Sequence, residues 1–215
     1  MSAVVLPAFD PASLERAARA IQDGELVIVP TDTVYGVAAS LARPDAIERM
    51  YRAKGRRPDK PIALLVDRFE DVELVAADIP EAARRLMEAF WPGGLTIVLR
   101  AQANVPAAVT AGGPTIAVRM PDHPIPRDLI RRLGEPLPTT SANRSNQPSA
   151  VTLAEAVRDL GAAVSVALDA GPAPGGIESS VVDATNLPPI VYRVGAVSIE
   201  ALETVLGTPV VPPGR

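Results

Sequence analysis

The stretch Val29-Pro-Thr-Asp-Thr-Val-Tyr-Gly36 decides how the rest of the sequence is interpreted. Residues 25–29 form a short apolar, β-branched run of the kind that makes a buried strand. Pro30 then removes a backbone donor, and the strand ends where the hydroxyls begin. Hydroxyls and a carboxylate therefore gather at a strand end, which is where open α/β sheets bind ligands. A turn in which Asp32 bonds its own backbone is the alternative that this stretch alone leaves open.

The composition excludes several kinds of site. The 215 residues include no cysteine and a single histidine, His123. Disulfides, thiolate metal sites, cysteine nucleophiles and a histidine-rich zinc site are therefore ruled out. Residues 1–10 lack the features of a signal peptide, and no apolar run reaches the length of a membrane helix. We expect a cytoplasmic protein of one domain that makes no membrane contact.

Charge is unevenly distributed along the chain. The net charge of −4 argues against a protein whose whole surface binds nucleic acid. Between residues 43 and 60, however, basic residues outnumber acidic ones. Such a local cationic patch suits an anionic small molecule better than a long polyanion. Aromatic residues make up 3% of the chain, which leaves few platforms for stacking single-stranded nucleic acid.

Helix and strand signals mix without strict alternation. Helix signals occur at residues 11–23, 43–54, 80–90, 124–133, 152–160 and 198–206, with Asp10, Thr152 and Ser198 as capping residues. Strand signals occur at residues 25–29, 62–66, 95–99, 115–119, 164–168, 179–183 and 190–194. Residues 101–114 indicate a loop or a loose helical turn, and residues 137–149 a polar connection. The pattern predicts an α/β fold with a twisted, open, mixed sheet and flanking helices, and it leaves the strand order open.

Three polar clusters, at residues 31–35, 54–60 and 139–149, interrupt the apolar chain at the ends of predicted elements. Arg119 and Arg193 lie at predicted strand ends, where a guanidinium could bind a carboxylate or a phosphate. The combination is typical of a nucleotide site, although the P-loop and dinucleotide-binding motifs are missing. Phosphate would have to be held by side-chain cations and hydroxyls.

Each feature also has a purely structural interpretation. Spacing alone favours a solvated charged loop at residues 54–60, and it is equally typical of surface ion pairs at Arg119 and Arg193. His123 is more typical of a loop hydrogen bond than of a general base. Ser141 has no adjacent histidine and no evident Ser-Lys dyad, which disfavours a nucleophilic serine.

Several stretches occur in a specific order: Pro30-Thr-Asp-Thr-Val-Tyr-Gly36, Lys54-Gly-Arg56, Pro92-Gly-Gly-Leu-Thr96, Val118-Arg-Met-Pro121, Ser141-Ala-Asn143, and Ser179-Ser-Val-Val-Asp183 with Arg193-Val-Gly195. Together they resemble the YrdC/Sua5 family of threonylcarbamoyl-AMP synthases over residues 12–206. The resemblance implies a YrdC-like catalytic domain at residues 1–206 and a short Pro-rich tail at residues 207–215. It also implies the short, single-domain type, which leaves open how the site is covered.

The resemblance implies a nucleotidyltransferase, an L-threonylcarbamoyladenylate synthase. Its substrates would be L-threonine, bicarbonate or CO2, and ATP, and its products threonylcarbamoyl-AMP and pyrophosphate, for the t6A37 modification of tRNA. Downstream tRNA threonylcarbamoyl-transfer proteins would be its partners. Such chemistry needs positioning and charge stabilisation more than a nucleophile. Mg2+ would arrive with ATP, bound by phosphates and waters and not by protein side chains.

Positions in these motifs assign the roles of individual residues. The catalytic residues would be Lys54 and Arg56, which would neutralise the phosphates. The ATP contacts would be Arg56, Lys60, Thr115, Ser141, Asn143, Ser149 and Arg193. The threonine contacts would be Thr33, Arg119, Thr139 and Ser179, with Arg119 as the natural partner of the threonine carboxylate.

One departure and two rivals accompany the resemblance. Asn146 stands where relatives usually carry a glycine, and we expect the turn to survive because asparagine tolerates a left-handed backbone. Another carbamoyl-adenylate-forming member of the fold is the first rival, although the cysteine zinc motifs of such proteins are missing. An RNA-binding module using residues 43–60 is the second, disfavoured by the acidic net charge. A weak RNA contact at this basic face is a further expectation.

Overall fold

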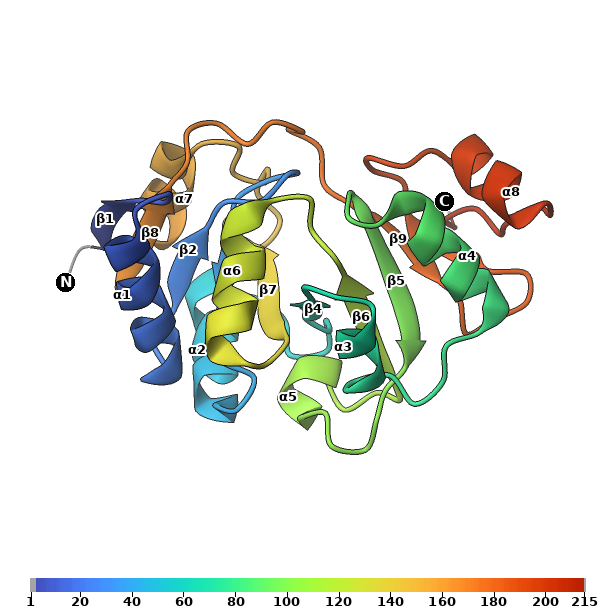
Figure 1. Cartoon of the computed structure of the whole chain (residues 1–215), viewed down its shortest axis with the longest axis horizontal. Coiled ribbons are helices and arrows are strands. Elements are labelled where there is room, and N and C mark those ends of the chain that lie inside the picture. Colours follow the sequence, from blue (N-terminus) through green and yellow to red (C-terminus); the bar gives the residue numbers. More distant parts are fainter. Residues whose placement is uncertain (1–2, 215) are drawn as a thin grey trace.

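One sheet runs through the molecule, with helices packed on both of its faces (Figure 1). The computed structural model describes residues 3–214. The ten strands lie in the order β1-β8-β2-β3-β7-β4-β6-β5-β9-β10. Parallel and antiparallel pairs coexist, since β4 pairs parallel with β6 and antiparallel with β7. The predicted α/β class with a mixed open sheet is confirmed, and the strand order is the part that the sequence left open.

The strands are β1 (Val4–Pro7), β2 (Val27–Val29), β3 (Gly36–Ala38), β4 (Ala63–Leu65), β5 (Leu95–Arg100), β6 (Thr115–Arg119), β7 (Leu137–Ser141), β8 (Val166–Asp169), β9 (Ser180–Asp183) and β10 (Ile190–Arg193). The helices are α1 (Pro11–Gln22), α2 (Pro44–Lys54), α3 (Glu70–Glu73), α4 (Glu81–Phe90), α5 (Ala107–Thr110), α6 (Pro124–Leu133), α7 (Leu153–Leu160) and α8 (Ile199–Leu206). Over residues 3–214, none of the helices has both the length and the apolar character that crossing a membrane requires.

Local side-chain chemistry sets the helix starts. Asp10 accepts hydrogen bonds from two backbone N–H groups at the start of α1, and Ser198 accepts one at the start of α8. Thr152 and Glu155 form a reciprocal capping box on α7. These predicted caps are confirmed. His123 caps α6, its Nδ1 accepting a hydrogen bond of 3.2 Å from a backbone N–H, which is the loop role favoured above.

The sheet buries an apolar core on each face because successive strand residues point to opposite sides. Val27 and Val29 of β2 pack in a core with residues of α1 and α6, which lie side by side in Figure 1. Ile28 between them packs in the second core, with residues of α2, α4, α7 and α8. The helices on both sides thus hold the central strands in fixed positions, and the site described below is built on these strands.

Three strands differ from the sequence prediction. β1 and β3 were not predicted, because β1 lies largely exposed at the sheet edge and β3 is a short Gly-Val-Ala segment directly after the polar turn. The prediction of one continuous polar connection over residues 137–149 is wrong, since Leu137–Ser141 forms β7 between β3 and β4. Its last three side chains line a cleft instead of an apolar core, so the usual hydrophobic pattern is missing.

The segment after α8 packs back onto the sheet. Val211 forms a bridge with Ile190 of β10, and the neighbouring Val210 is buried. The division into a catalytic domain at residues 1–206 and a tail at residues 207–215 stays a prediction.

Candidate functional site

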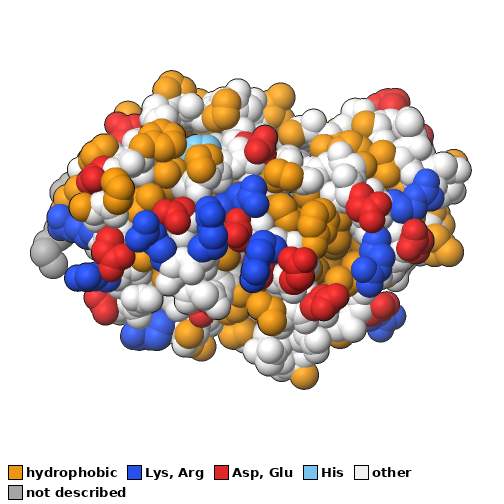
Figure 2. Space-filling view, in the orientation of Figure 1, with side chains coloured by type: hydrophobic (Ala, Val, Ile, Leu, Met, Phe, Trp, Pro, Cys, Tyr) orange, Lys and Arg blue, Asp and Glu red, His pale blue; other side chains and the backbone are white. Residues whose placement is uncertain are grey.

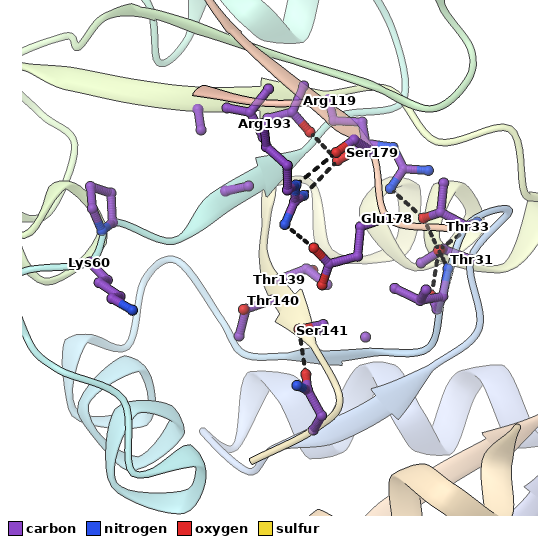
Figure 3. Close-up of a pocket in the computed structure, with 18 of the residues that line it drawn as sticks. Thr31, Thr33, Lys60, Arg119, Thr139, Thr140, Ser141, Glu178, Ser179 and Arg193 are labelled. Carbon is purple, nitrogen blue, oxygen red and sulfur yellow. Dashed lines mark hydrogen bonds and ion pairs between the residues drawn. The ribbon is translucent and has the colours of Figure 1, made fainter. Parts of the chain in front are cut away.

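A cleft of about 600 Å³ lies against the central strands and brings the three polar clusters together (Figure 3). The predicted site residues that line it are Thr33, Lys54, Arg56, Lys60, Thr115, Arg119, Thr139, Ser141, Asn143, Ser179 and Arg193. Ser149 lies instead in a neighbouring hollow of about 640 Å³. It still reaches the cleft, because its hydroxyl donates a hydrogen bond to the cleft residue Glu178.

The turn after β2 satisfies its own backbone through Thr31. The Thr31 Oγ1 accepts from the N–H groups of Thr33 and Val34 at 3.2 and 3.3 Å and donates to the Val34 carbonyl at 2.6 Å. Asp32 is therefore free to serve another partner, and its carboxylate contacts Arg119 at 2.5 Å. The alternative in which Asp32 bonds its own backbone does not hold.

Arg119, at the end of β6, is a buried cation whose guanidinium is held by three protein partners. Its side chain is 7% exposed, and it donates to Gly93 O at 2.9 Å, to Thr33 Oγ1 at 2.8 Å and to Asp32 Oδ1 at 2.5 Å. Burial lowers the pKa of Arg119, and the charge of Asp32 opposes that shift. The ion pair is internal, so the surface-pair interpretation of this arginine is wrong.

Lys54, the last residue of α2, is buried without a countercharge in contact. It is 3% exposed, and its Nζ donates to the carbonyl of Ser141, to the carbonyl of Asn143 at 2.6 Å and to Asn143 Oδ1 at 3.3 Å. These oxygens are all uncharged. Burial, helped by the charge of Arg56, lowers the pKa of Lys54 from 10.5 to about 8, while Glu178 and Asp159 oppose the shift. The ammonium therefore ties α2 to the loop that follows β7.

The loop 141–149 is held by its own side chains as well as by Lys54. The Ser141 hydroxyl donates to Asn143 Oδ1 at 2.5 Å, and the Asn143 amide donates to Gln147 O at 2.5 Å. Asn146 adopts a left-handed backbone with φ of 66°. The expectation that asparagine preserves this turn in place of glycine is confirmed. The hydroxyl of Ser141 is thus engaged by the amide oxygen of Asn143.

The segment 54–60 divides into a fixed part and an exposed part. Arg56 lines the cleft and donates to the carbonyls of Lys60 at 3.2 Å and Pro61 at 2.8 Å, which closes the loop. Burial lowers the pKa of Arg56. Arg57 is exposed and pairs with Asp59, as the solvated-loop interpretation expects. Lys60 is exposed at the cleft wall (Figure 3).

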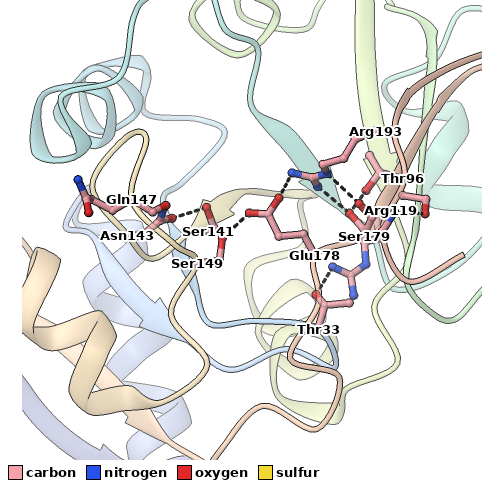
Figure 4. Close-up of polar contacts among 12 residues, drawn as sticks. Thr33, Thr96, Arg119, Ser141, Asn143, Gln147, Ser149, Glu178, Ser179 and Arg193 are labelled. Atoms are coloured by element: carbon pink, nitrogen blue, oxygen red, sulfur yellow. Dashed lines mark hydrogen bonds and ion pairs between the residues drawn. The ribbon is translucent and has the colours of Figure 1, made fainter. Parts of the chain in front are cut away.

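Two site residues were missed at the sequence level, Glu178 and Thr96. Glu178 forms an ion pair with Arg193 and accepts a hydrogen bond from Ser149 (Figure 4). Thr96 Oγ1 lies 2.8 Å from Ser179 Oγ, and Arg193 Nε donates to Ser179 O at 2.9 Å. Thr96 lay inside a quoted motif without a role. The only local signal for Glu178 is its place directly before the paired serines.

The donor set of the cleft suits an anionic ligand. Its lining holds Lys54, Arg56, Lys60, Arg119 and Arg193, and the acidic residue that faces them is Glu178. Within residues 3–214 there is no cluster of three or more His, Cys, Asp or Glu side chains that could hold a metal ion. Such a set can neutralise phosphates and position a carboxylate. The prediction that Mg2+ arrives with ATP is not tested by this geometry.

Comparisons with known proteins agree with this chemistry. The Sua5–YciO–YrdC family model, described as telomere recombination, matches residues 19–195. The chain is 40% identical over 191 residues to the threonylcarbamoyl-AMP synthase of Pyrococcus abyssi and 37% identical over 199 residues to that of Bacillus subtilis. These alignments cover 89% and 92% of this chain but 56% and 57% of the two relatives. The chain thus spans little more than half the length of these curated relatives.

A solved structure shares the fold closely. The crystal structure of P. abyssi Sua5 complexed with L-threonine superposes with a TM-score of 0.93 at 36% identity. The superposition covers 96% of this chain and 62% of that one. The strands and helices that carry the cleft are therefore shared with a protein that was crystallised with an amino acid.

Proposed function

The chain belongs to the Sua5/YrdC family, and we propose that it is an L-threonylcarbamoyladenylate synthase. It would make threonylcarbamoyl-AMP and pyrophosphate from L-threonine, bicarbonate or CO2, and ATP. The observation that carries the proposal is the convergence of two groups of side chains in one cleft. One group surrounds Arg119, and the other surrounds Lys54 and Arg56.

Arg119 is the proposed partner of the threonine carboxylate. Three of its five N–H donors are held by Gly93, Thr33 and Asp32, so two donors remain for a ligand in a fixed orientation. Thr33, Thr139 and Ser179 are the other proposed threonine contacts. The relative crystallised with L-threonine supports a threonine site in this fold.

Lys54 and Arg56 are proposed to neutralise the phosphates of ATP. The other proposed ATP contacts are Lys60, Thr115, Ser141, Asn143, Ser149 and Arg193. The amine of threonine adds to CO2 and gives a carbamate, whose oxygen attacks the α-phosphorus. The bond between the α-phosphorus and the bridging oxygen breaks, and pyrophosphate leaves with the electron pair. Such a reaction gains from fixed cations because charge builds up on the phosphoryl oxygens. Mg2+ would enter as part of the ATP complex.

Other proteins would use the product of this reaction. The adenylate would serve downstream tRNA threonylcarbamoyl-transfer proteins that make t6A37. These partners, the weak RNA contact and the cytoplasmic location are predictions from the sequence.

An RNA-binding module is the weaker alternative. Arg43 and Arg49 pair with Asp45, and Arg57 pairs with Asp59, so much of the basic charge at residues 43–60 is already compensated. On the face shown in Figure 2, basic and acidic side chains are likewise interleaved. A binding surface for a long polyanion would need a continuous positive field.

Pyrophosphate release from ATP tests the proposal. With purified protein, release should require both L-threonine and bicarbonate, and serine should replace threonine poorly. Mass spectrometry should detect threonylcarbamoyl-AMP as the second product. ATP that stays intact under all these conditions would contradict the synthase and leave a ligand-binding or RNA-binding relative of the fold.

A further inference from the structure

Glu178 connects two walls of the cleft that belong to different segments. Its carboxylate contacts the guanidinium of Arg193 on β10 and the hydroxyl of Ser149 at the end of the loop 141–149 (Figure 4). The side chain is 32% exposed, so the carboxylate sits inside the cleft and still meets solvent. Glu178 is therefore neither a core residue nor a freely moving surface residue.

Hydrogen bonds to the turn after β2 and to the segment after β10 fix the backbone around Glu178. Gly175 donates to Asp32 O at 2.9 Å, and a Cβ added there would lie 2.6 Å from the same oxygen. Tyr35 donates from its hydroxyl to Gly171 O at 2.6 Å. The Glu178 carbonyl also accepts from Ala196 N at 2.9 Å. The position of the carboxylate is thus determined by the fold on both sides of residue 178.

The groups around this carboxylate are those proposed to bind ATP. Arg193 and Ser149 touch it directly. Its negative charge also acts on Lys54 and Arg56, where it counteracts the lowering of the pKa that burial causes. A phosphate bound by Arg193 would share that guanidinium with Glu178, and two anions at one cation repel each other.

We propose that the Glu178 carboxylate competes with the phosphates of the nucleotide: it takes the place of a ligand anion between Arg193 and Ser149, so that a phosphate reaches these two residues only by displacing it. This inference rests on the proposed function, because it needs Arg193 and Ser149 to be nucleotide contacts. A ligand without phosphate leaves the ion pair between Glu178 and Arg193 in place. A phosphorylated nucleotide restores a charge-assisted contact, and it gains further from Lys54 and Arg56.

The test measures binding, not turnover, of three ligands: the non-hydrolysable α,β-methylene-ATP, AMP and adenosine. Titration calorimetry would compare the wild type with E178Q and E178A at fixed pH and salt, with and without Mg2+. Both variants should bind the two phosphorylated ligands at least about tenfold more tightly, because the competing carboxylate is gone. Binding of adenosine should be unchanged.

E88Q is the matched control, because Glu88 is an exposed residue in α4 outside the cleft lining and its loss changes the net charge by the same amount. It should bind all three ligands as the wild type does. Thermal melting of each variant separates a change in binding from a loss of fold.

Three outcomes would overturn the inference. Unchanged nucleotide binding in E178Q and E178A would mean that Glu178 does not compete with phosphate. Weaker binding that appears only with Mg2+ present would make Glu178 part of the metal–nucleotide site instead. Failure of every variant, including the wild type, to bind any nucleotide would overturn the proposed function together with this inference.

Discussion

Lys54 and Arg119 are two buried cations in one cleft, and of the two Arg119 is the one paired with a carboxylate. Arg119 meets the carboxylate of Asp32 at 2.5 Å, so its charge is compensated within the protein. Lys54 meets only carbonyl and amide oxygens, and its pKa falls to about 8. A buried charge without a countercharge costs free energy, which a bound anion can recover. The difference indicates that the cleft accepts the more negative part of its ligands beside Lys54.

The largest effect on stability should come from breaking the compensated pair. Arg119→Ala should lower the free energy of unfolding by about 3–5 kcal/mol, because it leaves the carboxylate of Asp32, whose side chain is only 14% exposed, unpaired. Urea unfolding monitored by circular dichroism measures the change. The double variant Asp32→Asn with Arg119→Ala should lose less than the sum of the two single losses. Strict additivity would mean that Arg119 and Asp32 do not depend on each other.

Lys54→Met should have a small effect on stability and a large effect on nucleotide affinity. The loss of unfolding free energy should stay near 1–2 kcal/mol, because removal of an uncompensated charge offsets the lost hydrogen bonds. Affinity for α,β-methylene-ATP should fall by more than about tenfold, a change of roughly 1.4 kcal/mol, because the charge is needed by the phosphates. Calorimetric titration of the folded variant measures it. Retained nucleotide affinity would show that Lys54 serves only to hold the loop.

The pKa of Lys54 gives a pH dependence of known sign. Nucleotide affinity should decrease as the pH rises from 7 through 8 to 9, because the ammonium loses its proton near pH 8. The free energy of unfolding should instead increase as the pH rises from 8 to about 10.5. In this range the unfolded chain keeps a proton on Lys54 that the folded chain has lost. Lys54→Arg is the control, since arginine stays protonated throughout this range. An equal fall in affinity in both proteins would assign the titration to another group.

The smallest effect concerns the turn beside Lys54. Asn146→Gly should change the free energy of unfolding by no more than about 0.5 kcal/mol, because both residues accept the left-handed backbone. Asn146→Val should cost about 1–2 kcal/mol more, because a β-branched side chain is strained there. Thermal melting compares the two variants. Equal stability of the glycine and valine variants would show that Lys54, and not the turn, determines the loop conformation.

Interactions between residues close in the sequence could be predicted, and interactions between distant residues could not. The caps Asp10, Thr152 and Ser198 were predictable because a cap involves residues within one turn. β7 was missed because its polar face is recognisable only once β3 and β4 lie on either side of it. Pairing of Arg119 with Asp32 joins residues from distant parts of the chain, and no local pattern reports it.

The candidate site shows the same division. Eleven of the twelve predicted site residues line the cleft, and the twelfth, Ser149, reaches it through Glu178. The contacts among these residues could not be predicted. The hydrogen bonds of Lys54 Nζ to loop oxygens were not predicted, and Glu178 became noticeable only through its contacts with Arg193 and Ser149. Sequence thus indicates which residues gather, and the packing of distant segments determines how they are paired.

The strand order also has a consequence for synthesis on the ribosome. β2 and β3 pair with each other, and their remaining neighbours are β8 and β7, which are made about a hundred residues later or more. A nascent chain that ends at residue 130 therefore has neither the loop beside Lys54 nor the partner strands that cover the edges of this hairpin. Until β7 and β8 emerge, the first hairpin offers open strand edges of the kind that chaperones protect. The cleft is completed only when β10 adds Arg193, after β7 and β8 have been made.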